Sequence, residues 1–203
     1  LFKFSGHRWL GIHLGMTGSL QIEGSNYQSH KHDALILFQS KQALIFRDPR
    51  QFGRLRMHIG KNAPPWWSEL PVSMLDQRFK PSVLSSALSR HGKRPVKALL
   101  LDQRYFQGMG NWMADEVLWR AHIHPARKCA EISSAEGKKL FTKIKFVVKG
   151  AMHSVGKHGG DPPKGWLFHV RWKNGGICPK TKTPLAREEI GGRTSCWSPV
   201  LQK

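Results

Sequence analysis

The stretch from Gly108 to Pro125 combines residue types that could bind an anion. Gly108 and Gly110 permit a tight backbone path, and Asn111 is a good N-cap for the helix that would follow. A glycine turn that leads into a helix exposes backbone N–H groups that have no acceptor within the helix. We therefore expect a phosphate-binding turn at this point of the chain.

The residues after this turn have the pattern of an amphipathic helix. Asp115 and Glu116 favour the positive N-terminal end of a helix, and Pro125 would stop it. One apolar face is formed by residues with helical spacing, which are Met113, Val117 and Ala121. An ordinary place in a core is the simpler interpretation of these three side chains.

The charge of the chain indicates which partner would supply the phosphate. The 203 residues include 33 Lys and Arg against 13 Asp and Glu, which gives a net charge of +20. Such an excess points to nucleic acid or to an anionic membrane. The sequence has no apolar run long enough to span a bilayer and no basic amphipathic helix with a bulky aromatic face, which disfavours a membrane. Three scattered cysteines indicate a reducing, intracellular compartment.

The periodicity of apolar residues predicts a β-rich start, a helical middle and a β-like tail. Residues 1–60 hold short apolar runs typical of strands buried on both faces, and the runs at 34–38 and 43–46 indicate a hairpin. Helical spacing begins near Pro81, and Gly191-Gly192 predicts a tight hairpin turn. We expect an α+β fold with three parts, at residues 1–75, 76–164 and 165–203.

A lysine-rich helix is predicted in the last third of the chain. Ser133 and Glu136 have the spacing of a capping box. The helix that they open would bury Leu140, Ile144, Val147, Val148 and Ala151. From Lys138 to Lys203 there are 14 basic and 3 acidic residues, so this region is a candidate for contact with a nucleic acid backbone. A solvated helix face explains most of the lysines equally well.

Four segments of the chain follow one family pattern. Residues 108–118 read Gly-x-Gly-Asn-x-x-Ala-Asp-Glu-x-Leu, and Ile-His-Pro follows at 123–125. The other three segments are 13–18, 48–53 and 191–194. In their order and spacing these segments resemble the formamidopyrimidine-DNA glycosylase/endonuclease VIII family, and the central one resembles its helix-two-turn-helix signature.

This resemblance implies a fold and an activity. Residues 1–75 would form a partial N-terminal β-sandwich, 76–164 a helix-two-turn-helix domain and 165–203 a β-hairpin finger. The parent protein would be a base-excision repair DNA glycosylase with abasic-site lyase activity. It would act as a monomer on oxidised bases in damaged double-stranded DNA. The loop that selects the base in this family would fall between Gly150 and Gly165.

The resemblance assigns Met16, Arg50 and Phe52 to the gap that an extruded base leaves in the duplex. Removing a base from the stack costs roughly a few kcal/mol. An apolar wedge offsets this cost, and an arginine can hydrogen-bond the orphaned partner base. The alternative places Met16 and Phe52 in a core and pairs Arg50 with Asp48.

Further roles are implied for residues in or near the matched segments. Asn111 and Arg193 would bind phosphates, and Arg193 at the hairpin tip would also assist the second elimination step. Lys97 and His32 fit family positions that contact DNA. A helix cap also explains Asn111, and an exposed turn charge also explains Arg193. Glu116 would hold the DNA-binding turns in place.

The chain departs from the family pattern at the metal site of the finger. The typical finger holds zinc with two Cys-x-x-Cys pairs. Here Cys178 is the only cysteine of the first pair, the second pair falls on Ser198 and Leu201, and Cys196 is two residues early. Structural zinc needs four good ligands, so we predict no metal and no other cofactor. As in the zincless fingers of plant and animal branches, packing would replace the metal, here by Trp197, Pro199 and Leu201.

The family's catalytic amine has no counterpart in the printed residues. The family uses an N-terminal proline followed by a glutamate, and a further lysine just before the strand that begins here at Leu1. Lys3 lies inside that strand, and an amine nucleophile must be near neutral to form a Schiff base with the sugar. We therefore expect an N-terminally truncated enzyme that is inactive alone. The alternatives are a non-catalytic damaged-DNA-binding protein and an RNA-binding protein, although the chain shows no stacking motifs of single-strand RNA modules.

Overall fold

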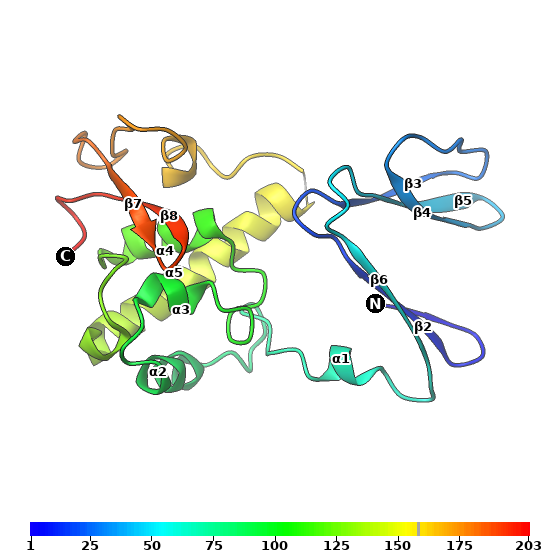
Figure 1. Cartoon of the computed structure of the whole chain (residues 1–203), viewed down its shortest axis with the longest axis horizontal. Coiled ribbons are helices and arrows are strands. Elements are labelled where there is room, and N and C mark those ends of the chain that lie inside the picture. Colours follow the sequence, from blue (N-terminus) through cyan, green and yellow to red (C-terminus); the bar gives the residue numbers. More distant parts are fainter. Residues whose placement is uncertain (158) are drawn as a thin grey trace. The chain divides into compact units, whose positions relative to one another are not determined.

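The protein forms two compact units, Leu1–Glu69 and Leu70–Lys203, in a computed structural model (Figure 1). The structure describes residues 1–157 and 159–203, so His158 in the predicted base-selecting loop lies outside the described residues. The second unit holds the helices and the C-terminal hairpin together. The division into three parts at residues 75 and 164 therefore stays a prediction.

The first unit contains two three-stranded antiparallel sheets. One sheet has the order β1-β2-β6, with strands that span Phe2–Phe4, Arg8–His13 and Arg54–Ile59. The other has the order β3-β5-β4, with strands that span Ser19–Gly24, Gln42–Arg47 and Asp33–Phe38. A single helical turn, α1, follows β6 at Pro65–Ser68.

The predicted hairpin in this unit is confirmed, whereas its predicted burial is only partly correct. Strands β4 and β5 pair in register, with Leu37 opposite Leu44, and a bulge lies near Asp33. The central strand β5 is buried at Ala43, and also at Ile45 and Phe46. In contrast, the apolar side chain of Phe38 at the end of the edge strand β4 is exposed. The apolar runs are therefore not buried on both faces throughout.

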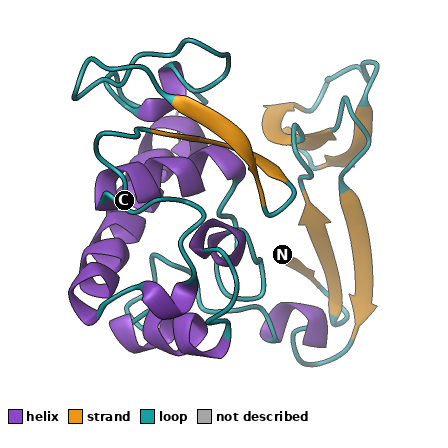
Figure 2. Cartoon of the chain, turned by 60° about the vertical axis from the view of Figure 1, so that its left-hand side comes forward, coloured by secondary structure: helices purple, strands orange, loops and turns teal. Residues whose placement is uncertain are grey.

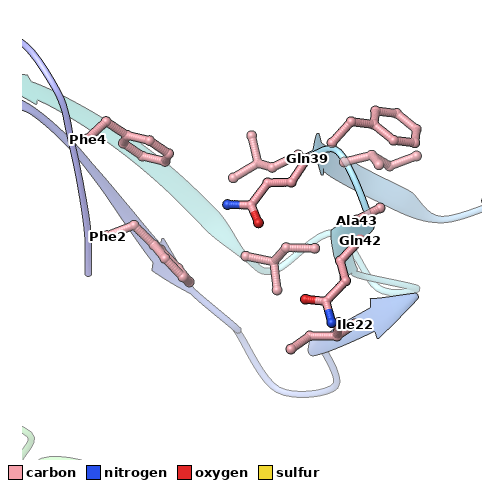
Figure 3. A pocket seen from close by; sticks show the side chains of 10 residues that line it. Phe2, Phe4, Ile22, Gln39, Gln42 and Ala43 are labelled. Carbon is pink, nitrogen blue, oxygen red and sulfur yellow. The ribbon is translucent and has the colours of Figure 1, made fainter. Parts of the chain in front are cut away.

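An apolar hollow of about 420 Å³ lies in the first unit (Figure 3). Its lining includes Phe2 and Phe4 from β1 and Ile22 from β3. The polar side chains in the lining are those of Gln39 and Gln42. Because no ionisable side chain lines it, this hollow has none of the groups that acid–base chemistry needs.

The second unit is built from helices and a two-stranded hairpin (Figure 2). Its α-helices are α2 (Pro81–Arg90), α3 (Val96–Leu100), α4 (Asn111–Ala121) and α5 (Ser134–Ala151). Shorter helical segments are η1 (Cys129–Glu131), the π-helical η2 (Met152–Lys157) and η3 (Leu167–His169). The strands of the hairpin are β7 (Ala186–Ile190) and β8 (Arg193–Trp197).

The capping box predicted for α5 is confirmed. The Ser133 hydroxyl accepts a hydrogen bond from the backbone N–H of Glu136 at 3.3 Å. The Glu136 carboxylate in turn accepts one from the backbone N–H of Ser133 at 2.9 Å. The predicted apolar face of the helix is buried in the core of the unit, at Leu140, Ile144, Val147, Val148 and Ala151. Within the described part of the chain, no helix has the length and apolar character needed to cross a bilayer.

Helix α4 differs from its prediction at both ends. Gly110, not Asn111, is the N-cap, and Asn111 is the first helical residue. The helix ends at Ala121 because His122 adopts a left-handed conformation with φ of 64°, so Pro125 lies beyond the end of the helix. Asp115 is fully buried in the second turn and takes no part in capping.

The predicted hairpin turn at Gly191-Gly192 is confirmed. Both glycines have positive φ, 62° and 75°, as a type I′ turn between two paired strands requires. Strands β7 and β8 pair antiparallel on either side of this turn, with Ile190 opposite Arg193. The turn therefore places Arg193 at the tip of the hairpin.

Candidate nucleic-acid interface

The turn before α4 leaves its backbone open to a ligand. Gly108 has φ of 83°, a conformation that favours glycine. A Cβ added at Gly108 or Gly110 would meet no heavy atom within 4 Å. The first N–H groups of α4, beginning at Asn111, have no acceptor within the helix. Together these features form the kind of concave N–H surface that binds phosphate.

Asn111 connects this turn to the hairpin. Its side-chain Nδ2 donates a hydrogen bond to the backbone carbonyl of Thr194 at 2.9 Å. Thr194 follows Arg193 directly, so the predicted phosphate-binding residues Asn111 and Arg193 lie next to one another. The Asn111 Oδ1 atom is buried without a hydrogen-bond partner among the described residues. The hydrogen bond thus joins the start of α4 to the hairpin, and Asn111 is not the N-cap of the helix.

Lys97 is buried, and we correct its predicted role. Its side chain is 0% exposed, so it presents no surface to DNA in this structure. The ammonium donates to the carbonyl of Thr194 at 2.9 Å and to the hydroxyl of Ser195 at 2.8 Å, and it pairs with Asp115 at 2.6 Å. Lys97 thus positions strand β8 from inside the protein.

Asp115 organises the buried end of this network. Its Oδ2 atom accepts hydrogen bonds from the guanidinium of Arg171 at 2.6 Å and from the backbone N–H of Cys196 at 3.1 Å. Burial lowers the pKa of Lys97, and the charge of Asp115 opposes that effect. A buried pair of charges needs further hydrogen bonds to its atoms, and both the Lys97 ammonium and the Oδ2 atom of Asp115 have them. The network therefore fixes β8 to both α3 and α4.

The tip of the hairpin is held against α3. A Cβ added at Gly191 would lie 2.8 Å from the Cβ of Ala98, which is closer than real Cβ atoms come. Arg193 itself is exposed, and within the described residues no ion pair involves it. A rigid backbone thus presents a guanidinium beside the open N–H groups of α4. This arrangement suits an anionic oxygen, for which arginine offers several donors.

Two loops of the first unit carry the three predicted wedge residues. Met16 is 72% exposed and Phe52 is 52% exposed. The guanidinium of Arg50 lies 4.8 Å from the centre of the Phe52 ring. A Cβ added at Gly15 would lie 2.7 Å from the backbone of Phe52, so the two loops pack directly against each other. Met16, Arg50 and Phe52 therefore belong to one surface of this unit.

The structure does not support the alternative interpretation of these residues. The exposure of Met16 and Phe52 is too great for side chains in a core. Asp48 is buried, and its Oδ2 accepts a hydrogen bond from the backbone N–H of Gly53 at 2.6 Å. No ion pair between Arg50 and Asp48 occurs among the described residues. Asp48 instead shapes the loop that carries Arg50 and Phe52.

His32 lies at the same end of the first unit. Its side chain is exposed, and its backbone has φ of 81°. Its carbonyl accepts a hydrogen bond from the backbone N–H of Asp48 at 2.8 Å, which joins it to the loop of Arg50 and Phe52. The loop of His32 is stabilised by Asp33, whose carboxylate pairs with Arg47 at 2.8 Å. His32 therefore belongs to the same group of loops as Arg50 and Phe52.

The finger packs around a buried cluster of side chains. The indole N–H of Trp119 donates to the Sγ of Cys178 at 3.4 Å, within a buried cluster that includes Leu185 and Cys196. Of the predicted packing residues, Trp197 is buried and Leu201 is partly buried, whereas Pro199 is exposed and makes no such contribution. Among the described residues, no three His, Cys, Asp or Glu side chains are arranged to hold a metal ion.

The sequence did not reveal the partners of Asp115 in the central helix. Arg171 is 56 positions from Asp115, and no local pattern links them. Glu116 binds Arg120 through one oxygen and the backbone N–H of Leu167 through the other, each at 2.6 Å. Burial raises the pKa of Glu116, and Arg120 opposes the rise. These contacts agree with the positioning role expected of Glu116.

Comparison with known proteins accounts for this combination of loops, helix and hairpin. Residues 1–55 match a family model described as the formamidopyrimidine-DNA glycosylase N-terminal domain. Residues 70–160 match one described as the formamidopyrimidine-DNA glycosylase H2TH domain. A formamidopyrimidine-DNA glycosylase of Psychromonas ingrahamii is 32% identical over 100% of this chain and 77% of its own length. The chain belongs to the formamidopyrimidine-DNA glycosylase family.

Other members of this family differ in how much of their length the chain covers. The formamidopyrimidine-DNA glycosylase of Thermus thermophilus is 32% identical, and the chain spans 78% of it. The one from Arabidopsis thaliana is 30% identical, and the chain spans only 52% of it. The formamidopyrimidine-DNA glycosylase relatives are therefore longer than the sequence printed here.

Solved formamidopyrimidine-DNA glycosylase structures share the fold. The crystal structure of the Thermus thermophilus protein is 30% identical with a TM-score of 0.79, over 98% of this chain and 77% of that one. A structure of MutM in complex with DNA containing carbocyclic 8-oxo-G is 25% identical with a TM-score of 0.80, over 98% and 75%. The Lactococcus lactis enzyme bound non-covalently to DNA with an AP site has a TM-score of 0.81 at 23% identity, over 98% and 75%, which shows the fold alone.

Proposed function

We propose that this protein binds damaged double-stranded DNA in base-excision repair, and that its full-length form is a DNA glycosylase with abasic-site lyase activity. The observation that carries the proposal is the hydrogen bond from Asn111 to Thr194. It joins the family's signature helix to the hairpin tip and places Arg193 beside open N–H groups. The relatives with solved DNA complexes support duplex DNA as the ligand.

In this proposal the two loops of the first unit act on the base stack. Met16 and Phe52 are exposed apolar side chains that can occupy the space of an extruded base. Arg50 lies against the Phe52 ring and can hydrogen-bond the base left without a partner. His32, Asn111 and Arg193 would contact the phosphodiester backbone. These contacts position the DNA without reading its sequence.

The lyase step needs an amine that forms an imine at C1′ of the sugar while the base leaves. Lys97 does not fit this role, because its ammonium has three partners and its side chain is 0% exposed. Lys3, the middle residue of β1, is exposed, with its Nζ 5.0 Å from the centre of the Trp9 ring. We propose that the 203 residues bind abasic DNA but do not provide the nucleophile.

Borohydride trapping tests the binding and the chemistry separately. The 203-residue chain should bind an abasic duplex in a fluorescence anisotropy assay but form no rapid covalent adduct in the presence of borohydride. A version that carries an N-terminal Pro-Glu segment encoded upstream should give rapid trapping and strand cleavage. Its proline-to-glycine variant serves as the control and should be slower in both covalent trapping and strand cleavage.

The outcomes separate the enzyme from its rival. Rapid trapping by the 203 residues alone would show that the nucleophile is among them. Failure of every Pro-Glu version to trap, with abasic binding intact, would favour the non-catalytic damaged-DNA-binding protein. Failure to bind any duplex would contradict the proposed function itself.

A further inference from the structure

A group of cations lies on the second unit away from the phosphate site described above. The C-terminal end of α4, one face of α5 and the finger supply its members, which are Arg120, His122, Lys139, Lys143 and Lys180. We call this group the basic cluster. All five side chains are exposed or half-buried.

The members of the basic cluster are neighbours: Arg120 and Lys180 contact the same Trp119 ring, and Lys139 and Lys143 lie one turn apart on α5. The pKa of His122 is lowered by burial and then by the charges of Lys139, Lys180 and Lys143. The pKa of Lys180 is lowered by burial and then by the charges of Arg120 and Lys143. Segments far apart in the sequence thus bring like charges together at one place.

Trp119 fixes two of these cations. Its indole is 1% exposed, with the Nζ of Lys180 4.7 Å and the guanidinium of Arg120 5.4 Å from the ring centre. Arg120 also lies 4.8 Å from the ring of Phe146 and 5.0 Å from that of Trp166. Cation–π contacts of this kind hold the charged groups in place without neutralising them.

Acidic side chains do not balance the basic cluster. Glu116 pairs with Arg120 at 2.6 Å, but its second oxygen already accepts from the backbone N–H of Leu167. Within the described residues, no ion pair involves Lys139, Lys143 or Lys180. The three lysines therefore form an uncompensated positive surface, which attracts polyanions.

Helix dipoles explain only part of this arrangement. Arg120 and His122 lie at the C-terminal end of α4, where the partial charge of the helix is negative. Lys139 lies in the second turn of α5, which begins at Ser134, and Lys143 lies near its middle, so the dipole of α5 does not stabilise either lysine. The charges of these two lysines are therefore not compensated by their own helix.

The basic cluster and the phosphate site are at opposite ends of α4. Asn111 is the first residue of the helix and Ala121 the last, which corresponds to a length of roughly 16 Å at 1.5 Å per residue. The first N–H groups face the phosphate site beside Arg193. Lys180 lies against Trp119 near the other end of the helix, so a single phosphate held at Asn111 does not also contact Lys180.

We propose that the basic cluster binds the phosphodiester backbone of a second nucleic acid segment while the first is held at Asn111 and Arg193. The proposal rests on the proposed function, since it needs a duplex at the first site. Exposed cations spread over three chain segments suit the repeated charges of a polymer. Such binding does not read sequence, because it uses only phosphates.

Bridging of two duplexes tests this proposal. One short abasic duplex carries a donor dye and a second, intact duplex carries an acceptor dye, both at low salt. A protein that holds both should give energy transfer at substoichiometric protein. The variant Lys139→Gln/Lys143→Gln/Lys180→Gln should lose this transfer at least about tenfold, because three phosphate contacts are removed. Its affinity for the abasic duplex alone should change by less than about twofold.

A matched variant controls for net charge. Lys93→Gln/Lys128→Gln/Lys182→Gln also removes three exposed lysines of the second unit and should keep the energy transfer. Energy transfer that survives in the cluster variant would overturn the inference. So would the absence of energy transfer in wild type that has bound one abasic duplex. Either result would leave the proposed function intact. Displacement of the second duplex by labelled poly-glutamate at equal charge would overturn the inference. It would indicate that the basic cluster binds an acidic protein. Absence of any duplex binding would overturn both proposals.

Discussion

Arg193 owes its position to contacts made by the residues around it. Gly191 and Gly192 form the turn, and Thr194 is held by hydrogen bonds from Asn111 and Lys97. The arginine side chain itself is exposed at the end of this rigid backbone. A change at Arg193 should therefore remove a charge and leave the structure as it is.

For Arg193→Ala we expect the affinity for intact and for abasic duplex to fall by a similar factor, about tenfold. A phosphate contact positions DNA of any sequence, so its loss is uniform. Fluorescence anisotropy at fixed salt measures both affinities. Lys182→Ala, which also removes an exposed charge from the finger, should change neither by more than about twofold. A loss confined to abasic DNA would place Arg193 at the lesion rather than on the backbone.

The wedge residues should affect only the preference for damaged DNA. Met16→Ala and Phe52→Ala should bring the affinity for abasic duplex close to that for intact duplex, since nothing then fills the gap. Thermal unfolding should change little, because both side chains are mostly exposed. Met57→Ala, another exposed methionine of the same unit, is the control and should keep the preference. Early melting of the two wedge variants would instead indicate a core role.

Hydrogen bonds to one thiol make the stability of the finger dependent on pH. Burial raises the pKa of Cys178, but hydrogen bonds from Thr181, Trp119 and Lys180 outweigh it and lower the pKa from 9.0 to about 7. Because the folded pKa is the lower one, the stabilisation is present above about pH 9 and is lost as the pH falls through about 7. As the pH rises from about 7 to about 9, the free energy of unfolding of wild type should increase by about 1–2 kcal/mol relative to that of Cys178→Ser.

Urea denaturation at several pH values measures this difference. Cys196→Ser is the matched control, because burial and then the charge of Asp115 raise the pKa of Cys196 to about 11. A raised thiol pKa adds no stability between pH 7 and 9, so this control should not reproduce the trend. If the free energy of unfolding of wild type and of Cys178→Ser changes with pH in the same way, the lowered pKa of Cys178 does not stabilise the finger.

At the scale of elements, the buried network of Lys97 joins α3, α4 and β8. Lys97→Met should lower the free energy of unfolding by about 3–5 kcal/mol, because it leaves the charge of Asp115 incompletely paired. Ser133→Ala removes only a helix cap and should lower the free energy of unfolding by about 1 kcal/mol. Chemical denaturation compares the two, and Lys97→Met/Asp115→Asn should recover part of the loss. Equal losses of stability for Lys97→Met and Ser133→Ala would show that the buried network contributes little to the stability of the fold.

Sequence reasoning succeeded for elements defined by neighbouring residues. The capping box at Ser133 and the turn at Gly191-Gly192 depend on short-range hydrogen bonds and backbone conformation, so both were predictable. The resemblance likewise placed Arg193 at the tip of the hairpin, whereas the hydrogen bond from Asn111 to Thr194 was not predicted. Asp115 was misjudged because its charge was interpreted by its place in α4, whereas its partners come from distant segments. Burial of Lys97 is also a tertiary property and leaves no local pattern.

At the scale of the whole molecule, the net charge of +20 should dominate the binding of DNA. Lys and Arg release counterions from the phosphates that they neutralise, so affinity falls linearly on a log–log plot against salt. Between about 50 and 200 mM salt we expect a loss of about a thousandfold, typical of proteins with several phosphate contacts. Arg193→Ala should make the slope shallower by about one. A nearly flat salt dependence would mean that few cations meet phosphates.

The contact between Gly191 and Ala98 constrains how this protein can diverge. A side chain at position 191 is excluded twice, by the positive φ and by the Cβ of Ala98 at 2.8 Å from where its own would stand. Any residue larger than alanine at position 98 would press on the hairpin tip in the same way. Mutational scans of DNA binding should therefore find position 191 intolerant of any side chain and position 98 intolerant of larger ones, although neither residue carries a functional group.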